Sequence, residues 1–195
     1  MELIDIAVLS VAAFMIGAIP FSYIITRMVA KKDIRTMGSH NPGATNVFRS
    51  LNLGCGLAVL ILDMAKGFIP VYWAMNTLPD TPVVPVMALS VVLGHDYSPF
   101  LGMKGGKGVA TSLGVFLILN TQLTLLVLLI FVILTIVFGF ISFASVIGAA
   151  SYPVLAYVLG MTDYMWLSAV LAALIIGRHH SNLKRLWHGK ETKTI

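Results

Sequence analysis

The chain has 195 residues, of which 58% are hydrophobic and only 11% are charged. Soluble domains carry about 25% charged residues, and a domain of this size leaves a large surface in water. Together with a mean hydropathy of +0.92, this composition excludes a soluble globular protein and predicts an integral membrane protein. The net charge of +5 fits cationic loops beside anionic lipids, so membrane lipids are expected partners and nucleic acid is not.

Seven apolar segments are candidates to cross about 30 Å of hydrocarbon, which takes about 20 helical residues. The stretch 109–138 is too long for one crossing, and the polar run Asn120-Thr121-Gln122 interrupts it, so we expect a short helix followed by a second one. The expected helices cover residues 3–23, 54–75, 83–93 with an extension toward Phe100, the part of 109–138 before Asn120, 123–138, 142–159 and 164–177. The sequence therefore predicts an all-α polytopic membrane protein with about seven transmembrane helices.

The charged residues predict the orientation of these helices. With the N-terminus outside and the C-terminus in the cytoplasm, twelve of the 13 Lys and Arg residues fall in cytoplasmic segments, and the last, Lys66, lies within the second span. The outer segments then contain Glu2, Asp5, Asp80 and Asp163 but no cation. This asymmetry is what the positive-inside rule expects. The glutamate and aspartate near the start, in place of a basic region, also argue against a signal peptide.

A first polar cluster, residues 38–49, lies on the predicted cytoplasmic side. Its glycines let backbone amides approach an anion closely, and Ser39, Thr45 and asparagines such as Asn41 supply neutral hydrogen-bonding groups. Arg49 would add a bidentate contact to phosphate or carboxylate. The alternative is a turn-rich loop at the membrane surface, because Gly, Asn and Ser are common in turns.

In a second cluster, residues 94–111, Lys104 and Lys107 bracket Gly105 and Gly106 immediately before an apolar helix. Exposed amides, a positive helix end and two ammonium groups favour phosphate binding. The spacing matches neither a Walker A loop nor the dinucleotide pattern. The alternative, a flexible positive-inside loop, explains the lysines but not the surrounding glycines.

A third cluster, residues 178–191, has cations that would suit a lipid anchor, yet His179, Asn182 and Glu191 are not needed for one. No metal site is expected, because adjacent residues such as His179 and His180 point about 100° apart on a helix and have no Cys or acidic partner. The single cysteine, Cys55, excludes an internal disulfide.

Two features of the spans leave alternatives open. Asp63 and Lys66 stand at i, i+3 on the second span, where ionisable residues are costly. They either form an ion pair that holds the helix in the bundle or line a site. Ser142, which opens the sixth span, is expected to be an N-cap or a further hydroxyl donor at the cytoplasmic mouth.

With these residues in view, the sequence closely resembles the acyl-phosphate-dependent glycerol-3-phosphate acyltransferases of bacterial membranes, the PlsY family. The resemblance covers nearly the whole chain. Its motifs are Gly17-Ala18-Ile19-Pro20-Phe21, the loop 38–49, Leu62-Asp63-Met64-Ala65-Lys66-Gly67, the stretch 95–111 and the tail 178–191. The chain departs from the family pattern at His40, where glycine is usual, at Met103, where phenylalanine is common, and at Ser98-Pro99, where many members carry proline one position earlier.

The resemblance implies one membrane domain over residues 1–195, in the bacterial cytoplasmic (inner) membrane, with its site facing the cytoplasm. It implies transfer of a fatty acyl group from acyl phosphate to the sn-1 hydroxyl of glycerol 3-phosphate, giving lysophosphatidate and phosphate, without a cofactor. It predicts no oligomeric state. The implied site residues are Ser39, Asn41, Arg49, Lys104, Lys107, Ser142, His179 and Asn182, with His95 and Glu191 also at motif positions.

The residues allow a mechanism. We expect Lys104, Lys107, Arg49 and the amides of Gly105 and Gly106 to hold the phosphates, and Ser39, Asn41, Asn182 and His179 to orient groups around the carbonyl. The acceptor hydroxyl must lose a proton, for which His95, His179 and a substrate phosphate oxygen are candidates. We expect direct transfer without an acyl-enzyme, because the chain has no Gly-x-Ser-x-Gly elbow.

Two other functions are compatible with a basic membrane protein. A transporter of an organic phosphate would place its site near the midplane and show inverted repeats, whereas the candidate anion ligands here crowd one predicted face. A lipid-binding scaffold would need basic residues but not this density of Gly, Asn and Ser around them.

Overall fold

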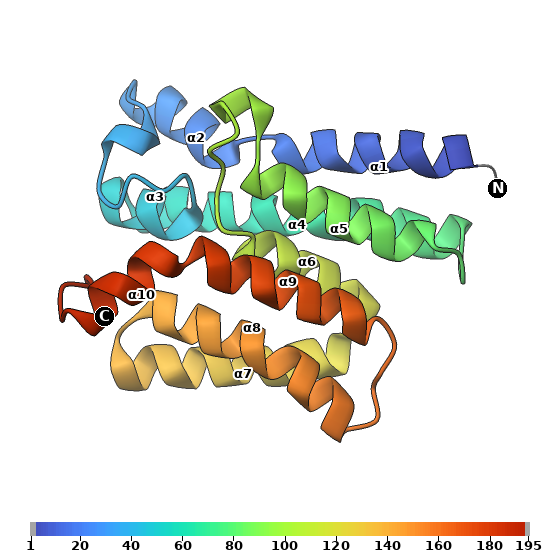
Figure 1. Cartoon of the computed structure of the whole chain (residues 1–195). Coiled ribbons are helices and arrows are strands. Elements are labelled where there is room, and N and C mark those ends of the chain that lie inside the picture. The colour runs from blue at the N-terminus through green and yellow to red at the C-terminus, as the bar shows by residue number, and fades with distance from the viewer. Residues whose placement is uncertain (1–2, 194–195) are drawn as a thin grey trace. The chain divides into compact units, whose positions relative to one another are not determined.

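The computed structural model describes residues 3–193, in which every regular element is a helix (Figure 1). The chain divides into two compact units, the first running to Ile118 and the second beginning at Leu119. The first unit contains α1 (Leu3–Ala18), α2 (Phe21–Ala30), the 3₁₀ turn η1 (Ile34–Thr36), α3 (Ala44–Ser50), α4 (Leu53–Thr77), α5 (Val83–Asp96), the 3₁₀ turn η2 (Pro99–Leu101) and α6 (Val109–Leu119), whose last residue crosses the boundary. The second contains α7 (Thr121–Phe138), α8 (Ile141–Val158), α9 (Met165–Arg178) and α10 (His180–Trp187).

Five helical stretches among the described residues are long and apolar enough to cross a membrane: Leu3–Ala30, Leu53–Thr77, Val83–Leu101, Thr121–Phe138 and Ile141–Val158. Two shorter apolar helices, α6 and α9, occupy the remaining predicted segments. All seven predicted segments are therefore helical, which confirms the all-α membrane fold. The expected single membrane domain stays a prediction.

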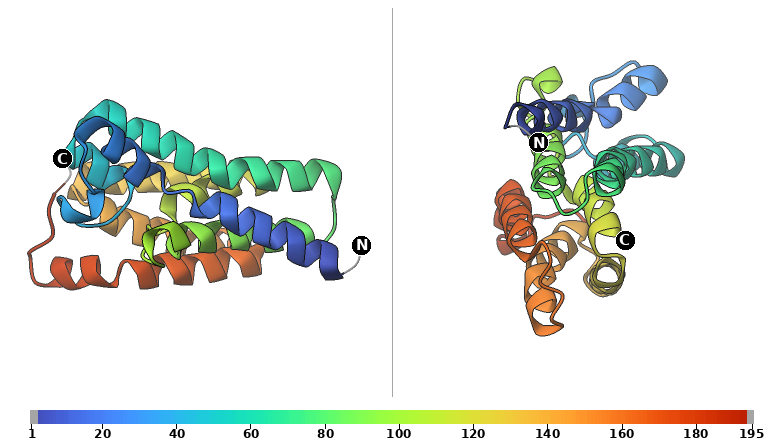
Figure 2. Two further views of the ribbon diagram at one scale, coloured as in Figure 1. Left: turned by 90° about the horizontal axis from the view of Figure 1, so that it is seen from above. Right: turned by 90° about the vertical axis from the view of Figure 1, so that its right-hand side faces the viewer.

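The first span differs from the expectation of one helix over residues 3–23. The helix α1 ends at Ala18 and α2 begins at Phe21, and the axes of the two helices are not collinear (Figure 2). Pro20 causes the break, because proline lacks an N–H group and disfavours helical backbone at the residue before it. The break positions α2, and with it the polar segment that follows.

The interruption predicted at Asn120 is confirmed. The helix α6 ends at Leu119, and α7 begins at Thr121 with Asn120 as its N-cap. The side chain of Asn120 accepts a 3.0 Å hydrogen bond from the N–H group of Leu123. A capping asparagine satisfies a donor that the first turn of a helix leaves unpaired, so it separates two helices within one apolar run.

Close backbone contact joins α1 to α5 within the first unit. A Cβ atom added to Gly17 would lie 1.9 Å from the carbonyl oxygen of Val91, and one added to Gly94 would lie 2.0 Å from that of Phe14. Small residues permit such approach between membrane helices, where van der Waals packing drives association. The contact brings the end of α5 beside the end of α1.

In the second unit, α8 packs against both α7 and α9. Gly139 ends α7 with a positive φ of 78°, and its N–H group donates to the carbonyl of Thr135. Glycine adopts this left-handed geometry without the penalty that a side chain would add. The short helix α10 contacts α8 and α9.

Candidate active site

Asn46 organises the first polar cluster. Its side chain is buried, and its Nδ2 group donates to the carbonyls of Ile34, Met37 and Asn41 at 3.2, 3.0 and 3.0 Å. Its Oδ1 atom accepts from the N–H group of Ser39 at 2.9 Å. In the sequence, Asn46 ends the run Gly43-Ala44-Thr45-Asn46 and is not distinguished from the other asparagines of the loop. It is the residue that shapes the loop carrying the predicted site residues.

The predicted site residues of this loop lie around that centre. Ser39 is exposed and is tied to Asn46 through its backbone, and Asn41 is half-buried. Arg49 lies on α3 and is exposed. His40 has a φ of 60°, the left-handed region that favours glycine, so the glycine usual at this position has a conformational reason. The His40 ring nitrogen Nδ1 lies 2.9 Å from the carbonyl of Arg35.

Asp33 and Arg35 connect this loop to the second cluster. The guanidinium of Arg35 contacts both carboxylate oxygens of Asp33, the shorter distance being 2.7 Å, and its Nη1 atom donates to the carbonyl of Leu101 at 3.2 Å. Hydrogen bonding to Arg35 lowers the pKa of the Asp33 carboxyl despite its partial burial. From the sequence, Arg35 is only one of the predicted cytoplasmic charges, because its partner Leu101 is 66 residues away.

Lys104, Gly105, Gly106 and Lys107 form a loop, called here the glycine-lysine loop. It lies against the C-terminal end of α5. The N–H groups of Gly105 and Gly106 donate to the carbonyls of Asp96 and His95 at 3.1 and 3.0 Å. These two amides are therefore paired within the protein, and assigning them to phosphate was wrong. The glycines are needed for another reason: a Cβ atom on either would lie 2.0 Å from His95, from its carbonyl at Gly105 and from its ring nitrogen Nε2 at Gly106.

The two lysines of this loop differ in exposure. Lys104 is exposed and Lys107 is half-buried. Gly108 has a φ of 73° and immediately precedes α6. A Cβ atom on Gly108 would lie 3.2 Å from a carboxylate oxygen of Asp96. The lysines thus flank a loop whose backbone is held by hydrogen bonds to the end of α5.

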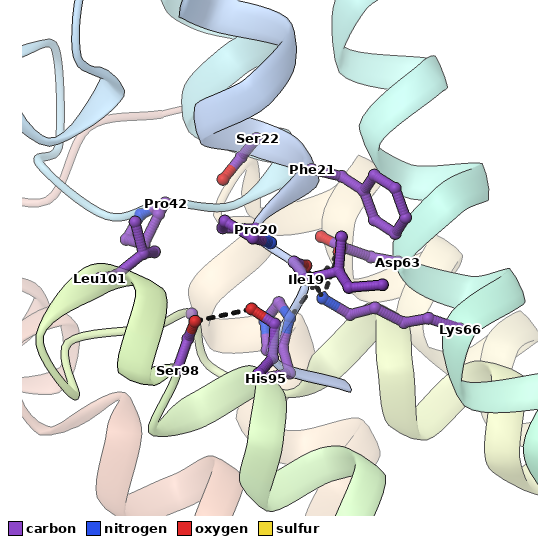
Figure 3. Close-up of a pocket in the computed structure, with 12 residues that line it drawn as sticks. Ile19, Pro20, Phe21, Ser22, Pro42, Asp63, Lys66, His95, Ser98 and Leu101 are labelled. Atoms are coloured by element: carbon purple, nitrogen blue, oxygen red, sulfur yellow. Dashed lines mark hydrogen bonds and ion pairs between the residues drawn. The ribbon is translucent and has the colours of Figure 1, made fainter. Parts of the chain in front are cut away.

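His95 lines a small pocket within the first unit (Figure 3). The pocket holds about 10 Å³ of free space and is polar at one side, where Asp63 and Lys66 reach in from α4. Lys66 Nζ lies 2.8 Å from the carboxylate of Asp63, so the predicted ion pair is formed, and both residues also line the pocket. The pocket is lined by Ala18, Ile19, Pro20, Phe21, Ser22, Pro42, Asp63, Lys66, His95, Ser98, Leu101 and Gly106.

In the second unit, two predicted residues, Ser142 and Asn182, contact the carboxylate of a third, Glu191. Glu191 Oε1 accepts from Ser142 Oγ at 2.9 Å and from Asn182 Nδ2 at 2.6 Å, and Oε2 accepts from Arg185 Nε at 2.7 Å. Burial raises the pKa of Glu191, but these hydrogen bonds outweigh burial, so the pKa lies below its ordinary value. Three donors thus hold the carboxylate in its ionised form.

This cluster decides the role of Ser142. The helix α8 begins at Ile141 with Phe140 as its N-cap, so Ser142 stands inside the first turn. The N-cap interpretation was wrong, and the hydroxyl group acts as a donor instead, to Glu191. The sequence could not show this contact because it joins residues 49 positions apart.

His179 lies at the junction of α9 and α10 and is buried. Its Nδ1 atom lies 2.8 Å from the carbonyl of Ile175. A carbonyl only accepts hydrogen bonds, so Nδ1 carries a proton. A neutral His179 therefore presents Nε2 as its basic nitrogen.

Comparison with known proteins finds relatives along nearly the whole chain. The glycerol-3-phosphate acyltransferase family matches residues 7–189. A glycerol-3-phosphate acyltransferase of Fusobacterium nucleatum is 40% identical over 184 residues, covering 94% of this chain and 95% of the relative. One of Syntrophomonas wolfei is 38% identical over 188 residues and covers 96% of each chain.

Two solved structures of PlsY, described as an integral membrane glycerol 3-phosphate acyltransferase, also match. The glycerol 3-phosphate form has a TM-score of 0.92, and the lysophosphatidic acid form has one of 0.89. Each is 36% identical and covers 97% of this chain and 95% of its own. Identity and coverage at this level, together with the integral membrane fold, place the chain in the glycerol-3-phosphate acyltransferase family.

Proposed function

We propose that the protein transfers a fatty acyl group from acyl phosphate to the sn-1 hydroxyl of glycerol 3-phosphate. The products are 1-acyl-glycerol 3-phosphate (lysophosphatidate) and inorganic phosphate, and the reaction is the first acylation of phospholipid synthesis. The observation that carries the proposal is the likeness to a PlsY structure in a glycerol 3-phosphate form along nearly the whole chain. The lysophosphatidic acid form of that relative supports the product.

The chemistry forms one ester bond and breaks one acyl–phosphate bond. The sn-1 oxygen attacks the acyl carbonyl, phosphate leaves with the electron pair of the broken bond, and the hydroxyl proton passes to a base. Phosphate is a good leaving group, so no strong general acid is required. Transfer is direct, since no serine elbow is present in the sequence.

The first unit supplies charges for the phosphates. Lys104 and Lys107 flank a loop that is fixed to α5, and Arg49 extends from α3, so each is proposed to bind phosphate. Gly105 and Gly106 are proposed to serve substrate binding by allowing that loop its close approach to His95. Ser39 and Asn41 lie on the loop that Asn46 shapes and are proposed to orient the reacting groups.

The second unit supplies hydrogen-bonding groups. Ser142 and Asn182 are proposed to bind substrate, with Glu191 fixing their side chains. His179 is proposed as a catalytic residue, because its Nδ1 contact leaves Nε2 as the basic nitrogen. His95 is the other protein candidate for the proton acceptor.

The proposed location is the bacterial cytoplasmic (inner) membrane, with the N-terminus outside and the site on the cytoplasmic side. The distribution of Lys and Arg supports this orientation. A site at the boundary of membrane and cytosol suits both substrates, because burial of the acyl chain gains about 0.8 kcal/mol per methylene while the anionic ends stay in water.

The test is an assay of the purified protein in detergent with acyl phosphate and labelled glycerol 3-phosphate. We expect lysophosphatidate and inorganic phosphate in equal amounts, and none with acyl-CoA in place of acyl phosphate. Product from acyl-CoA alone would overturn the proposed donor. In liposomes, flux of glycerol 3-phosphate without product would show a transporter instead. Acyl-protein trapped on turnover would contradict direct transfer.

A further inference from the structure

Arg35 is a cation beside the candidate site that the proposed mechanism does not use. Asp33 orients its guanidinium: Nε lies 3.1 Å from both carboxylate oxygens, and Nη2 lies 2.7 Å from Oδ2. The side chains of Arg35 and Asp33 are 36% and 27% exposed, and ion pairs near the surface add little to stability. The pairing does fix the direction of a planar group that has a further donor, Nη1.

The third nitrogen of this guanidinium binds a distant turn. Nη1 of Arg35 donates to the carbonyl of Leu101, the last residue of η2, at 3.2 Å. Carbonyls at the end of a helical turn need donors from elsewhere in the fold. The guanidinium carbon also lies 5.8 Å from the centre of the Tyr23 ring on α2. Arg35 therefore joins η1 to η2 across 66 positions of sequence.

On one side of this bond, η1 is tied to the first polar cluster. Asn46 of α3 donates to the carbonyl of Ile34 in η1 at 3.2 Å and accepts from the N–H group of Ser39 at 2.9 Å. Arg49 stands three residues further along α3. A shift of η1 would therefore displace Ser39 directly and Arg49 through α3.

On the other side, η2 is tied to the glycine-lysine loop. The N–H group of Met103 donates to the carbonyl of Ser98 at 2.8 Å, and that of Gly105 donates to the carbonyl of Asp96 at 3.1 Å. Lys104 thus stands between two residues whose amides are hydrogen-bonded. The backbone position of Lys104 therefore follows that of η2.

The two sides face each other within the first unit. Pro42 of the first polar cluster lines the same small pocket as Leu101 of η2 and Gly106 of the glycine-lysine loop (Figure 3). Cations on two separate loops bind one small dianion together only if the loops keep their separation. An error of about 1 Å in such a separation can cost about 10²-fold in activity.

We propose that Arg35 is a positioning residue for phosphate binding, which sets the separation between Arg49 on one side and Lys104 on the other. Asp33 acts through Arg35 by orienting its guanidinium. Neither Arg35 nor Asp33 touches the substrate. The inference rests on the proposed function for its effect on kinetics, because it concerns the cations proposed there to bind phosphate. The joining of the two loops by Arg35 has a test of its own.

The kinetic test is Arg35→Gln, assayed with acyl phosphate and glycerol 3-phosphate. We expect KM for glycerol 3-phosphate to rise about tenfold or more and kcat to fall less than about threefold, because loss of binding common to ground and transition states appears in KM. Glycerol 3-phosphate is the sensitive substrate, since acyl phosphate is also held by its apolar chain. A KM within about threefold of that of the unchanged protein, or a loss in kcat larger than the rise in KM, would overturn the proposal.

Two variants separate geometry from charge. Arg27→Gln is the matched control, because exposed Arg27 on α2 donates only locally among its described bonds, to the carbonyl of Lys31 at 2.9 Å; its KM should stay within about twofold. Arg35→Lys keeps the charge but lacks the planar fork that reaches Asp33 and Leu101 together. It should show the raised KM of Arg35→Gln. A normal KM in Arg35→Lys would mean that charge alone acts, and would overturn the proposal.

A double-mutant cycle tests whether Asp33 acts through Arg35. Asp33→Asn should raise KM for glycerol 3-phosphate in the unchanged background but by less than about twofold in the Arg35→Gln background, because the group it orients is gone. Effects that multiply would contradict this role of Asp33. The thermal unfolding midpoint shows which variants are folded, and Arg35→Lys replaces Arg35→Gln in every comparison if the latter does not fold.

Amide hydrogen exchange tests the joining of the loops without reference to activity. Arg35→Gln should raise the exchange rate at Gly102 and Met103, whose N–H groups close the turn that contains Leu101. Arg27→Gln should leave both rates unchanged. Unchanged exchange in a folded Arg35→Gln protein would overturn the proposal. An unchanged protein without acyl transfer would overturn the proposed function instead, and the exchange rates would still decide whether Arg35 joins the loops.

Discussion

The backbone of Gly106 lies against the imidazole of His95 so closely that a methyl group on Gly106 would be 2.0 Å from Nε2. The N–H group of Gly106 also donates to the carbonyl of His95 at 3.0 Å. The glycine-lysine loop is therefore held against the end of α5 by both packing and hydrogen bonding.

Gly106→Ala should lower kcat/KM for glycerol 3-phosphate by about 10²-fold, because the loop or the ring must shift by an ångström or more. The measurement is steady-state kinetics with acyl phosphate. Gly177→Ala is the control, since a Cβ atom there meets open space, and its rate should stay within about twofold. An alanine variant as active as the unchanged protein would mean that the loop yields without displacing His95.

Asn46→Ala should loosen the first polar loop. It removes the donor to three backbone carbonyls and the acceptor for the N–H group of Ser39. Leaving buried polar groups unpaired costs about 1–3 kcal/mol, so amide exchange over residues 34–50 should accelerate. Asn76→Ala, on an exposed face of α4, should change stability by less than about 0.5 kcal/mol. Equal exchange in both variants would refute the central role of Asn46.

Glu191→Gln should destabilise the second unit by about 1–3 kcal/mol, since it places an amide donor among three donors. The lowered pKa sets the pH dependence. A carboxyl whose folded pKa is depressed stabilises the fold above its unfolded value, here 4.5, and that contribution disappears as the pH falls through the folded value. The difference in Tm between the two proteins should therefore be constant from about pH 5 to 8 and shrink below about pH 4.5.

Asp163→Asn, in the exposed loop before α9, is the control for Glu191 and should match the unchanged protein in Tm at every pH. A difference between Glu191→Gln and the unchanged protein that persists at the lowest pH would mean that the carboxylate charge is not what stabilises the cluster.

His95→Ala should lower kcat by about 10²–10⁴-fold if its imidazole accepts the hydroxyl proton. The exposed His188, whose Nδ1 atom contacts the carbonyl of Lys184, provides the control: His188→Ala should keep kcat within about twofold. A loss below tenfold for His95→Ala would exclude it as the essential acceptor. The same assay of His179→Ala then separates the second histidine from a substrate phosphate oxygen.

Much of the fold could be predicted from the sequence because hydropathy alone marks membrane helices. The helix boundary at Asn120 was also predictable, since a polar run interrupts the apolar stretch and asparagine caps helices. The break at Pro20 was missed because the residues around it are apolar, so hydropathy does not register it. Proline was the available signal.

The candidate site was predictable as residue types but not as contacts. The charge and glycine content of residues 94–111 indicated a loop for anions, yet the pairing of the Gly105 and Gly106 amides depends on how the loop folds back onto α5. The bond from Ser142 to Glu191 likewise spans 49 positions. Such long-range hydrogen bonds leave no periodic trace in the sequence.

The anchoring of Glu191 has a practical consequence for handling the protein. Any form shortened before this residue loses the acceptor that gathers Ser142, Asn182 and Arg185, although it keeps every apolar helix. Such a form should still insert into membranes and pass an expression screen while failing in the assay. Affinity tags therefore belong beyond Ile195 on a spacer, where their removal leaves the carboxylate in its place.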